Sequence, residues 1–333
     1  MTIDLGALRR NAARLADVLE GTELWAVVKA NAYGHGAFDV APAALEAGAR
    51  ALCTATVPEA LALRRELPDA RILVMGPVSE TELRAAQEGR LELAVSDTRI
   101  PRGLPVHVKL DTGMGRYGIR ELPPLTDNVV GLMSHLATAD SDPAFAAEQI
   151  ERFRAVADAH PHLTAHVANS AAAFALPAAR FDAARCGIGL YGLSPFGTDP
   201  AEDGLEPVLS WRSELAQVKR LEPGESTGYG RLFVAREPMW IGLVPVGYAD
   251  GFRRDLTGTS VLVDGQRRRA VGTVSMDSFA VQLDRELPLG TPVTLIGDGL
   301  LAEEHARVAG TINYEIVCGI RADSDRARRE VVG

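Results

Sequence analysis

The stretch Ala26-Val27-Val28-Lys29-Ala30-Asn31-Ala32-Tyr33-Gly34-His35-Gly36 decides how the fold of this chain is interpreted. A hydrophobic run that begins at Leu24 ends abruptly in Lys29, and small residues, a tyrosine and two glycines follow. We interpret the run as a buried strand whose end carries the lysine. A lysine amine removed from water in this way is a usable nucleophile and the usual attachment point of an aldehyde cofactor. On this segment alone, a lysine that only marks where a strand surfaces fits equally well.

The run is the first of eight short apolar runs, each with the composition of a β-strand, that recur over the first two hundred residues. Between most of these runs lie stretches with helical spacing, as at Val57–Glu66, Ser79–Glu88 and Ala144–His160. The linkers near Ile100 and Tyr117 carry a weaker pattern, and we expect only short helices there. Such a series predicts a closed parallel barrel, because each parallel crossover needs a helix. The expected strands are Leu24–Val28, Ala51–Thr54, Arg71–Met75, Leu91–Val95, Val106–Leu110, Val129–Met133, Leu163–Val167 and Phe181–Arg185.

The sequence changes character near Leu205-Glu206-Pro207, after which Gly and Pro separate short alternating segments. This pattern is typical of a small antiparallel β domain, and one helix is expected at Ala302–Gly310. The run Arg267-Arg268-Arg269 is interpreted as a solvated turn. We therefore expect an α/β chain, a (β/α)8 TIM-like barrel over residues 1–206 followed by a mostly antiparallel β domain over 207–333. Its expected strands are Leu215–Leu221, Met239–Val246, Ser260–Val263, Ala270–Val274, Phe279–Leu283 and Pro292–Ile296.

Composition excludes several classes of protein. Of 333 residues, 47% are hydrophobic and 24% charged, as in an ordinary soluble globular chain. The net charge of −9 argues against nucleic acid as the main partner. No apolar run approaches the roughly 18 residues of a membrane span, and no signal-peptide pattern opens the sequence. Cys53, Cys186 and Cys318 form no metal-spaced pair and favour a reducing compartment. We expect a cytoplasmic protein without a metal site.

Chemically active side chains follow the expected strands at their carboxyl ends, where barrel enzymes place their active sites. Lysines, arginines, a histidine and small hydroxyl groups therefore converge on one rim, and such a rim favours an anionic ligand. In strand order these segments are Lys29 with Tyr33, Lys109 to Arg116, Ser134 with His135, Asn169 with Ser170, and Arg185 to Gly189.

The last two strands carry a candidate phosphate site. In this architecture a phosphate is usually held after strands seven and eight by backbone amides and small hydroxyl groups. Ser170 is expected to cap an Ala-rich helix with its hydroxyl toward the site, although a plain cap without a ligand is the alternative. Gly187-Ile188-Gly189 would let the backbone approach a phosphate, or it is simply a turn. Together with Lys29 on the neighbouring first strand, this cradle suits pyridoxal phosphate, which has an aldehyde at one end and a phosphate at the other.

The motifs of this chain resemble those of the alanine racemases, a family with a barrel and a β domain. The match to the family's cofactor-lysine signature covers Val28 to Gly36 nearly residue for residue, and further motifs follow in the family's order along almost the whole chain. They are Lys109 to Arg116, Ser134 to Asp140, Ala168 to Ala171, Gly228-Tyr229-Gly230, Val246 to Gly251, Ser275-Met276-Asp277 and Thr311 to Glu315.

The resemblance implies a two-base mechanism on a pyridoxal phosphate Schiff base. Lys29 would hold the cofactor and serve the D face of the substrate, while Tyr229 from the partner subunit would serve the L face. A racemase needs two groups, because the proton returns on the side opposite its removal. Arg185 would donate to the pyridine nitrogen and leave it unprotonated, and His135 with Arg185 would assist Tyr229.

The resemblance also assigns the remaining site residues. Arg116 and the backbone amide of Met276 would bind the substrate carboxylate. Lys109, at a position carbamylated in some members, would steer Arg116, and Asp277 would support the partner-side loop. An ordinary turn aspartate is an equally good explanation of Asp277. The other residues of the cofactor and entrance shells would be Tyr33, Asn169, Ser170, Gly187, Ile188, Tyr191 and Tyr248.

The implied function is interconversion of L- and D-alanine, supplying D-alanine for peptidoglycan, by a homodimer with composite active sites. A racemase of broader specificity, a barrel-type decarboxylase and a single-barrel cofactor carrier remain alternatives. Tyr229 and the second domain argue against the carrier, and the decarboxylases' cysteine-bearing motif is not evident. The sequence departs from the family at Ala322, where members commonly carry a phosphate-contacting tyrosine. We expect Tyr33 and Ser170 to supply the missing contact.

Overall fold

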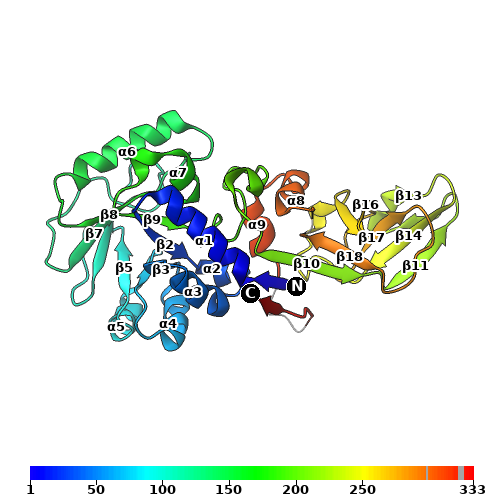
Figure 1. Ribbon diagram of the computed structural model, residues 1–333, viewed down its shortest axis with the longest axis horizontal. Coiled ribbons are helices and arrows are strands. Elements are labelled where there is room, and N and C mark those ends of the chain that lie inside the picture. Colours follow the sequence, from blue (N-terminus) through cyan, green and yellow to red (C-terminus); the bar gives the residue numbers. More distant parts are fainter. Residues whose placement is uncertain (298, 322–325) are drawn as a thin grey trace. The chain divides into compact units, whose positions relative to one another are not determined.

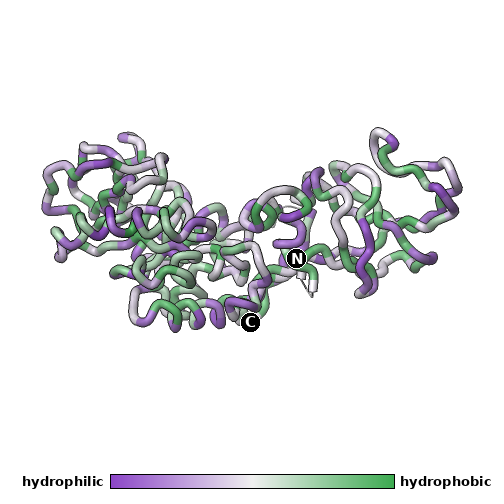
Figure 2. Tube along the Cα trace, turned by 90° about the horizontal axis from the view of Figure 1, so that it is seen from above, coloured by the Kyte–Doolittle hydropathy of each residue, from purple (hydrophilic) through white to green (hydrophobic). Residues whose placement is uncertain are grey.

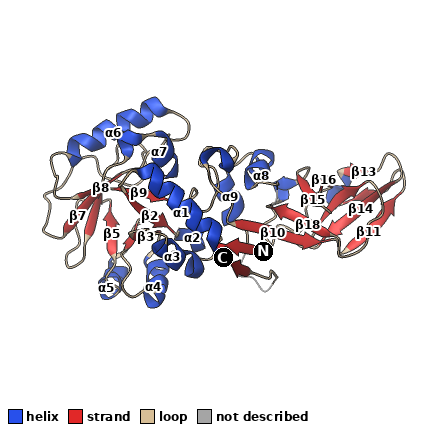
Figure 3. Ribbon diagram, in the orientation of Figure 1, coloured by secondary structure: helices blue, strands red, loops and turns tan. Residues whose placement is uncertain are grey.

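The computed structural model describes residues 1–297, 299–321 and 326–333. The position of Ala322 therefore lies outside the described residues. The described chain divides into two units, one formed by Leu5–Glu206 and the other by Met1–Asp4 with Pro207–Gly333. Figure 3 shows that helices are frequent in the first unit and that strands dominate the second.

The first unit is a closed barrel of eight parallel strands among the described residues, in sequential order from β2 to β9. Each lies at the position that the sequence predicts, which confirms the barrel. Their side chains are largely buried on both faces, as expected of a parallel sheet. The strands are β2 (Glu23–Val27), β3 (Ala51–Thr54), β4 (Ile72–Val74), β5 (Glu92–Val95), β6 (Val106–Lys109), β7 (Val129–Met133), β8 (Thr164–His166) and β9 (Ala183–Cys186).

Helices cover the outside of the barrel (Figure 1). Local sequence signals explain where they start: Thr56 and Glu59 form a capping box at α4, and the Asp142 carboxylate accepts hydrogen bonds from Ala144 N and Phe145 N at α6. Hydrophobic and hydrophilic stretches alternate along the trace in Figure 2, as in amphipathic helices. These helices are α1 (Leu5–Leu19), α3 (Ala37–Glu46), α4 (Val57–Glu66), α5 (Glu80–Glu88), α6 (Pro143–Ala157) and α7 (Ser170–Ala175).

Two connections lack the short helices that we expected. Residues 96–105 and 110–128, all of them described, contain no helix. Pro101, Gly103 and Pro105 interrupt the first connection. In the second, positive φ angles at Gly113, Gly115 and Gly118 are incompatible with a right-handed helix.

The second unit contains a largely antiparallel sheet, which confirms the predicted β domain. Its nine strands among the described residues run in the order β11-β14-β17-β16-β15-β18-β10-β1-β19. Leu221, Ile241 and Val271 belong to a hydrophobic cluster on this sheet. The strands are β1 (Thr2–Asp4), β10 (Leu209–Glu214), β11 (Gln217–Leu221), β14 (Met239–Val244), β15 (Ser260–Val263), β16 (Gln266–Val271), β17 (Phe279–Leu283), β18 (Pro292–Ile296) and β19 (Glu330–Val332).

Two expectations about the second unit were wrong, and a third was incomplete. Residues 1–4, expected in the barrel, pair instead with β10 and β19. The run Arg267-Arg268-Arg269 lies within β16 rather than in a turn, because the turn is made before it at Asp264 and Gly265, both with positive φ, and the run pairs with β15. Arg267 and Arg268 also form ion pairs, with Glu304 and Asp284. The helix expected at Ala302–Gly310 is confirmed as α8 (Ala302–Ala309), and a second helix that the sequence analysis did not predict, α9 (Asn313–Cys318), follows it.

No helix in the described part of the chain combines the length and the hydropathy that a membrane crossing requires.

Candidate active site

Lys29 lies two residues beyond the end of β2, at the start of the short helix α2 (Lys29–Tyr33). The four residues after it have φ angles from 51° to 54°, a left-handed turn that is uncommon for residues other than glycine. Tertiary hydrogen bonds hold this turn: Ala30 N donates to Glu59 Oε1 at 2.8 Å, and Asn31 Oδ1 accepts from Ala37 N at 2.8 Å. Such strained backbone is typical of functional sites, and here it fixes the position of a half-buried lysine.

Tyr33 and Tyr191 pack together beside this turn, with ring centroids 5.0 Å apart. The Tyr191 hydroxyl donates to the Val27 carbonyl at 2.8 Å, so that Tyr191 supports the strand end that leads to Lys29. The Tyr33 hydroxyl lies against Gly187, where an added Cβ would come within 2.5 Å of it. Glycine at 187 therefore leaves room for this hydroxyl.

Ser170 and the backbone after β9 form a small polar cradle. The Ser170 Oγ accepts hydrogen bonds from Gly187 N at 3.1 Å and Gly189 N at 3.3 Å. The expected helix cap is wrong by one residue: Asn169 caps α7 by accepting from Ala172 N at 2.9 Å, and Ser170 is the first helical residue. This change frees the Ser170 hydroxyl from capping and turns it toward the glycines. Ile188, between them, is buried.

Arg185 lies on β9 and is almost fully buried, with 4% of its surface exposed. It donates to Ser134 O at 2.7 Å, to His166 O at 2.8 Å and to His166 Nδ1 at 2.7 Å, and it lies 3.4 Å from His135 Nδ1. Burial lowers the pKa of Arg185 to about 10, so the guanidinium stays charged near neutral pH. The barrel thus holds a fixed cation beneath its rim.

Further cations surround this arginine. Burial, followed by the charges of Arg185, Arg116 and Lys29, lowers the pKa of Lys109 to about 8. Burial and the same group of cations, Arg185 first, lower the pKa of His135 to about 3. His135 is therefore neutral at physiological pH. The rim is electropositive, as the sequence predicts, and it can hold more than one anionic group.

The second unit carries four further predicted residues, which are Tyr229, Tyr248, Met276 and Asp277. Tyr248 N donates to Ser275 O at 3.1 Å, which places Tyr248 beside the loop that carries Met276 and Asp277. Arg326 links the segment after Tyr248 to the Met276 loop, since it donates to Asp250 Oδ1 and to Asp277 Oδ1, each at 2.7 Å.

Tyr229 is held in the same unit by a hydrogen bond from Thr273 Oγ1 to its carbonyl at 3.0 Å. Its side chain is 72% exposed, and Met276 is 52% exposed. Both predicted groups are therefore presented on the surface of this unit.

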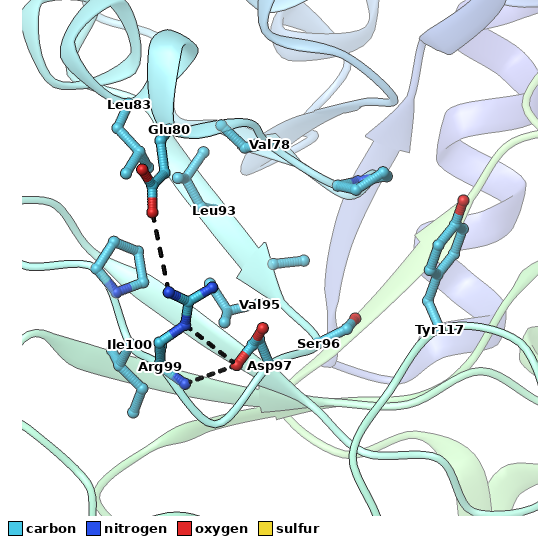
Figure 4. Close-up of a pocket in the computed structure, with 13 residues that line it drawn as sticks. Val78, Glu80, Leu83, Leu93, Val95, Ser96, Asp97, Arg99, Ile100 and Tyr117 are labelled. Carbon is cyan, nitrogen blue, oxygen red and sulfur yellow. Dashed lines mark hydrogen bonds and ion pairs between the residues drawn. The ribbon is translucent and has the colours of Figure 1, made fainter.

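A separate hollow of about 460 Å³ lies between the end of β5 and α5. Figure 4 shows Arg99 between Glu80 and Asp97 on one side of it and Tyr117 on another. None of the predicted site residues lines this hollow, although Lys109 Nζ lies 5.6 Å from the centre of the Tyr117 ring.

Comparisons with known proteins agree with the two-part fold. Residues 3–195 match the alanine racemase N-terminal domain family, and residues 208–329 match the alanine racemase C-terminal domain family. The chain belongs to the alanine racemase family. The resemblance inferred from the motifs is therefore confirmed.

Individual alanine racemases are similar to this chain over nearly their whole length. That of Ligilactobacillus salivarius is 41% identical over 351 residues, covering 96% of this chain and 94% of its own. The structure of the Streptomyces coelicolor alanine racemase superposes with a TM-score of 0.90 at 38% identity, covering 99% of this chain and 97% of its own. The structure of an alanine racemase from Bacillus anthracis with bound L-Ala-P superposes with a TM-score of 0.89 at 36% identity, covering 100% of this chain and 94% of its own.

The barrel brings the predicted residues of its own unit, Lys29 and Arg185 among them, to the carboxyl ends of its strands, whereas the remaining ones lie in the second unit. Sequence reasoning missed two residues that support the barrel part of the site. His166, on β8, contacts Arg185 directly, and Glu59 anchors the turn after Lys29. A histidine in the short run Thr164-Ala165-His166 was a usable signal, because a polar residue in a strand buried on both faces needs a partner inside the barrel.

Proposed function

We propose that the protein is a pyridoxal-phosphate-dependent alanine racemase that interconverts L- and D-alanine and supplies D-alanine for peptidoglycan. Family membership across both domains carries this proposal. The buried thiols of Cys53 and Cys186 suit the reducing cytoplasm.

The residues of the barrel rim fit pyridoxal phosphate. The Ser170 hydroxyl oxygen accepts from the Gly187 and Gly189 amides, and the Tyr33 hydroxyl fits into the space that a side chain at 187 would fill. The Ser170 and Tyr33 hydroxyls would donate to a phosphate here, and Lys29, two residues beyond the end of the strand next to β9, matches an aldehyde. When bound, the cofactor supplies a carbonyl that links covalently to amines and a ring that withdraws electrons from the α-carbon of the substrate.

Two residues of this chain would move the proton. Lys29 would remove or return the α-proton on one face, and Tyr229 would do so on the opposite face. Two groups on opposite sides are required, because a single base would return the proton to the face from which it came.

Arg185 would donate toward the ring nitrogen of the cofactor. A guanidinium does not readily give up its proton, so the nitrogen would remain unprotonated and the ring would withdraw electrons less strongly. This arrangement favours simple proton exchange at the α-carbon. The hydrogen bonds from Arg185 to Ser134 O and His166 O restrict its movement.

Arg116 and the amide of Met276 would bind the substrate carboxylate. Lys109 would orient Arg116, and carbamylation would make it an anion suited to this role. Carbamylation requires a neutral amine, and a pKa of about 8 gives a substantial neutral fraction near physiological pH.

The active site is proposed to be shared between the subunits of a homodimer. Tyr229, Leu232, Tyr248 and Met276 are exposed apolar or aromatic side chains of the second unit. Surfaces of this kind are typical of protein interfaces, and in the proposed homodimer Tyr229 would face the barrel of the partner subunit.

Turnover of a single enantiomer tests the function. L-alanine alone should relax to a near-equal mixture of enantiomers, and Lys29→Ala should abolish this. Full turnover by that variant would refute the proposal. Incubation with lysine, arginine and serine, followed by chiral separation, distinguishes an alanine racemase from one of broader specificity, and release of CO2 would identify a decarboxylase.

Subunit mixing tests the shared site. Lys29→Ala and Tyr229→Phe subunits should regain activity as heterodimers, because one of the two composite sites would be intact. Heterodimers without activity would show that each chain works alone.

A further inference from the structure

Beneath the rim, buried and half-buried side chains form a continuous hydrogen-bonded chain that leads away from Arg185. Its NH1 lies 2.7 Å from His166 Nδ1, and His166 Nε2 lies 2.9 Å from His107 Nδ1. His107 Nε2 then lies 2.9 Å from Glu92 Oε2, and Glu92 Oε1 accepts from Arg71 Nε at 2.8 Å. The chain joins residues of β5, β6, β8 and β9 through the interior of the barrel.

The two ends of the chain fix the direction of every hydrogen bond. A guanidinium can only donate, so His166 Nδ1 accepts and its proton lies on Nε2. That proton points at His107 Nδ1, so His107 also carries its proton on Nε2 and donates it to Glu92. The carboxylate of Glu92 can only accept, which completes the chain without a conflict.

The protonation states agree with this direction. Burial lowers the pKa of both histidines and keeps them neutral. For Glu92, burial opposes ionisation, but the hydrogen bonds from His107 and Arg71 hold its pKa below the ordinary value. A single carboxylate thus terminates a chain that begins at the buried cation.

The barrel is built around this chain. His107 and His166 are completely buried, and the Trp25 ring packs against both, at centroid distances of 5.7 and 4.6 Å. A Cβ at Gly131 would lie 2.1 Å from His107 Nδ1, so glycine is needed there to admit the imidazole. Hydrophobic side chains would fill the same space without the cost of burying polar groups. The chain therefore calls for a reason other than packing.

We propose that Glu92, acting through His107 and His166, is a positioning residue for Arg185. By accepting from His107, it fixes the proton of each histidine on Nε2 and so keeps His166 Nδ1 as an acceptor for the guanidinium. The expected effect on turnover rests on the proposed function, whereas the proton positions do not.

The first test uses the unaltered, cofactor-free protein and nitrogen NMR of its histidine side chains. Both His107 and His166 should be neutral with the proton on Nε2, and neither should titrate between about pH 6 and pH 9. A proton on Nδ1 of His166, or a cationic His166, would overturn the proposal. This NMR measurement requires neither bound cofactor nor racemase activity. It therefore tests the proton positions even if the protein proves not to be a racemase.

The second test compares Glu92→Gln with a matched control, Glu23→Gln. Glu23 accepts from Trp25 Nε1 at 2.8 Å and lies 4.0 Å from Arg71, so it shares the surroundings of Glu92 but lies outside the chain. The glutamine amide at position 92 would turn a donor toward His107 or Arg71. We expect a part of the molecules to carry the proton of His107 and His166 on Nδ1 instead of Nε2. We also expect kcat to fall about tenfold, with KM little changed. The control should match the wild type in both respects.

Each discordant result counts against the proposal. A lower kcat with unaltered proton positions would mean that Glu92 acts by another route. Altered proton positions with an unaltered kcat would mean that Arg185 does not depend on the chain. Should Glu92→Gln fail to fold, the proton positions in the unaltered protein still decide.

Discussion

Gly187 and Tyr33 lie so close together at the barrel rim that a Cβ at position 187 would come within 2.5 Å of the Tyr33 hydroxyl. Gly187→Ala should therefore displace this hydroxyl and weaken cofactor binding by roughly tenfold, which corresponds to the loss of about one hydrogen bond to a charged group. Titration of the cofactor-free protein with pyridoxal phosphate, followed by absorbance, measures the effect.

A double variant identifies the cause of that loss. If the new methyl group acts by displacing the hydroxyl, Gly187→Ala should cost less affinity in a Tyr33→Phe background than in the wild type. Equal costs in the two backgrounds would show that the methyl group acts elsewhere, for instance on the Gly187 amide.

Stability should decrease in acid partly because of His135. Its pKa is about 3 in the folded chain, against an ordinary value of 6.5. Between these values the unfolded chain binds a proton that the folded chain does not, so the free energy of unfolding falls as the pH drops. His135→Asn should reduce this slope by up to about 1.4 kcal/mol per pH unit. Urea unfolding between about pH 7 and pH 5 checks this, and an unchanged slope would mean that His135 is charged in the fold.

Carbon dioxide should influence activity through Lys109. The neutral amine that forms near its pKa of about 8 can react with carbon dioxide, and the resulting anion would pair with Arg116. Protein depleted of carbon dioxide should lose part of its activity and regain it with bicarbonate, whereas Lys109→Ala should not respond. A wild type that is indifferent to bicarbonate, with an unmodified lysine by mass spectrometry, would contradict carbamylation.

Arg326 should influence substrate binding through the loop that carries Met276. It bridges Asp250 and Asp277, beside the segments that carry Tyr248 and Met276. Arg326→Gln should raise the KM for alanine several-fold and leave cofactor affinity unchanged, because the loop that presents the Met276 amide would loosen. Arg268→Gln, which removes the ion pair between this β16 arginine and Asp284, serves as the control. Equal KM values for the two variants would exclude a specific role.

The barrel was predictable because its strands are short apolar runs separated by local signals. Ala51–Thr54 and Val129–Met133 have the same bounds in the sequence analysis and in the structure. The arginines of β16 were misread because their partners, Glu304 and Asp284, come from distant segments.

The site was predictable only in part, for similar reasons. Strand ends could be located, so Lys29, Ser170 and Arg185 were expected at one rim. The left-handed turn at residues 30–33 could not be predicted from the sequence. It contains no glycine, and it depends on hydrogen bonds to Glu59 and Ala37 that form only in the folded chain. The chain from Arg185 to Glu92 likewise depends on which strands become neighbours.

The most direct test of the account is to identify the residue that carries the cofactor. The protein is incubated with pyridoxal phosphate, reduced with borohydride, digested and mapped by mass spectrometry. We predict a pyridoxyl group on the peptide that contains Lys29 and none on the peptide that contains Lys109. Labelling of Lys109 alone, or an unlabelled Lys29 in protein that racemises alanine, would contradict the central claim.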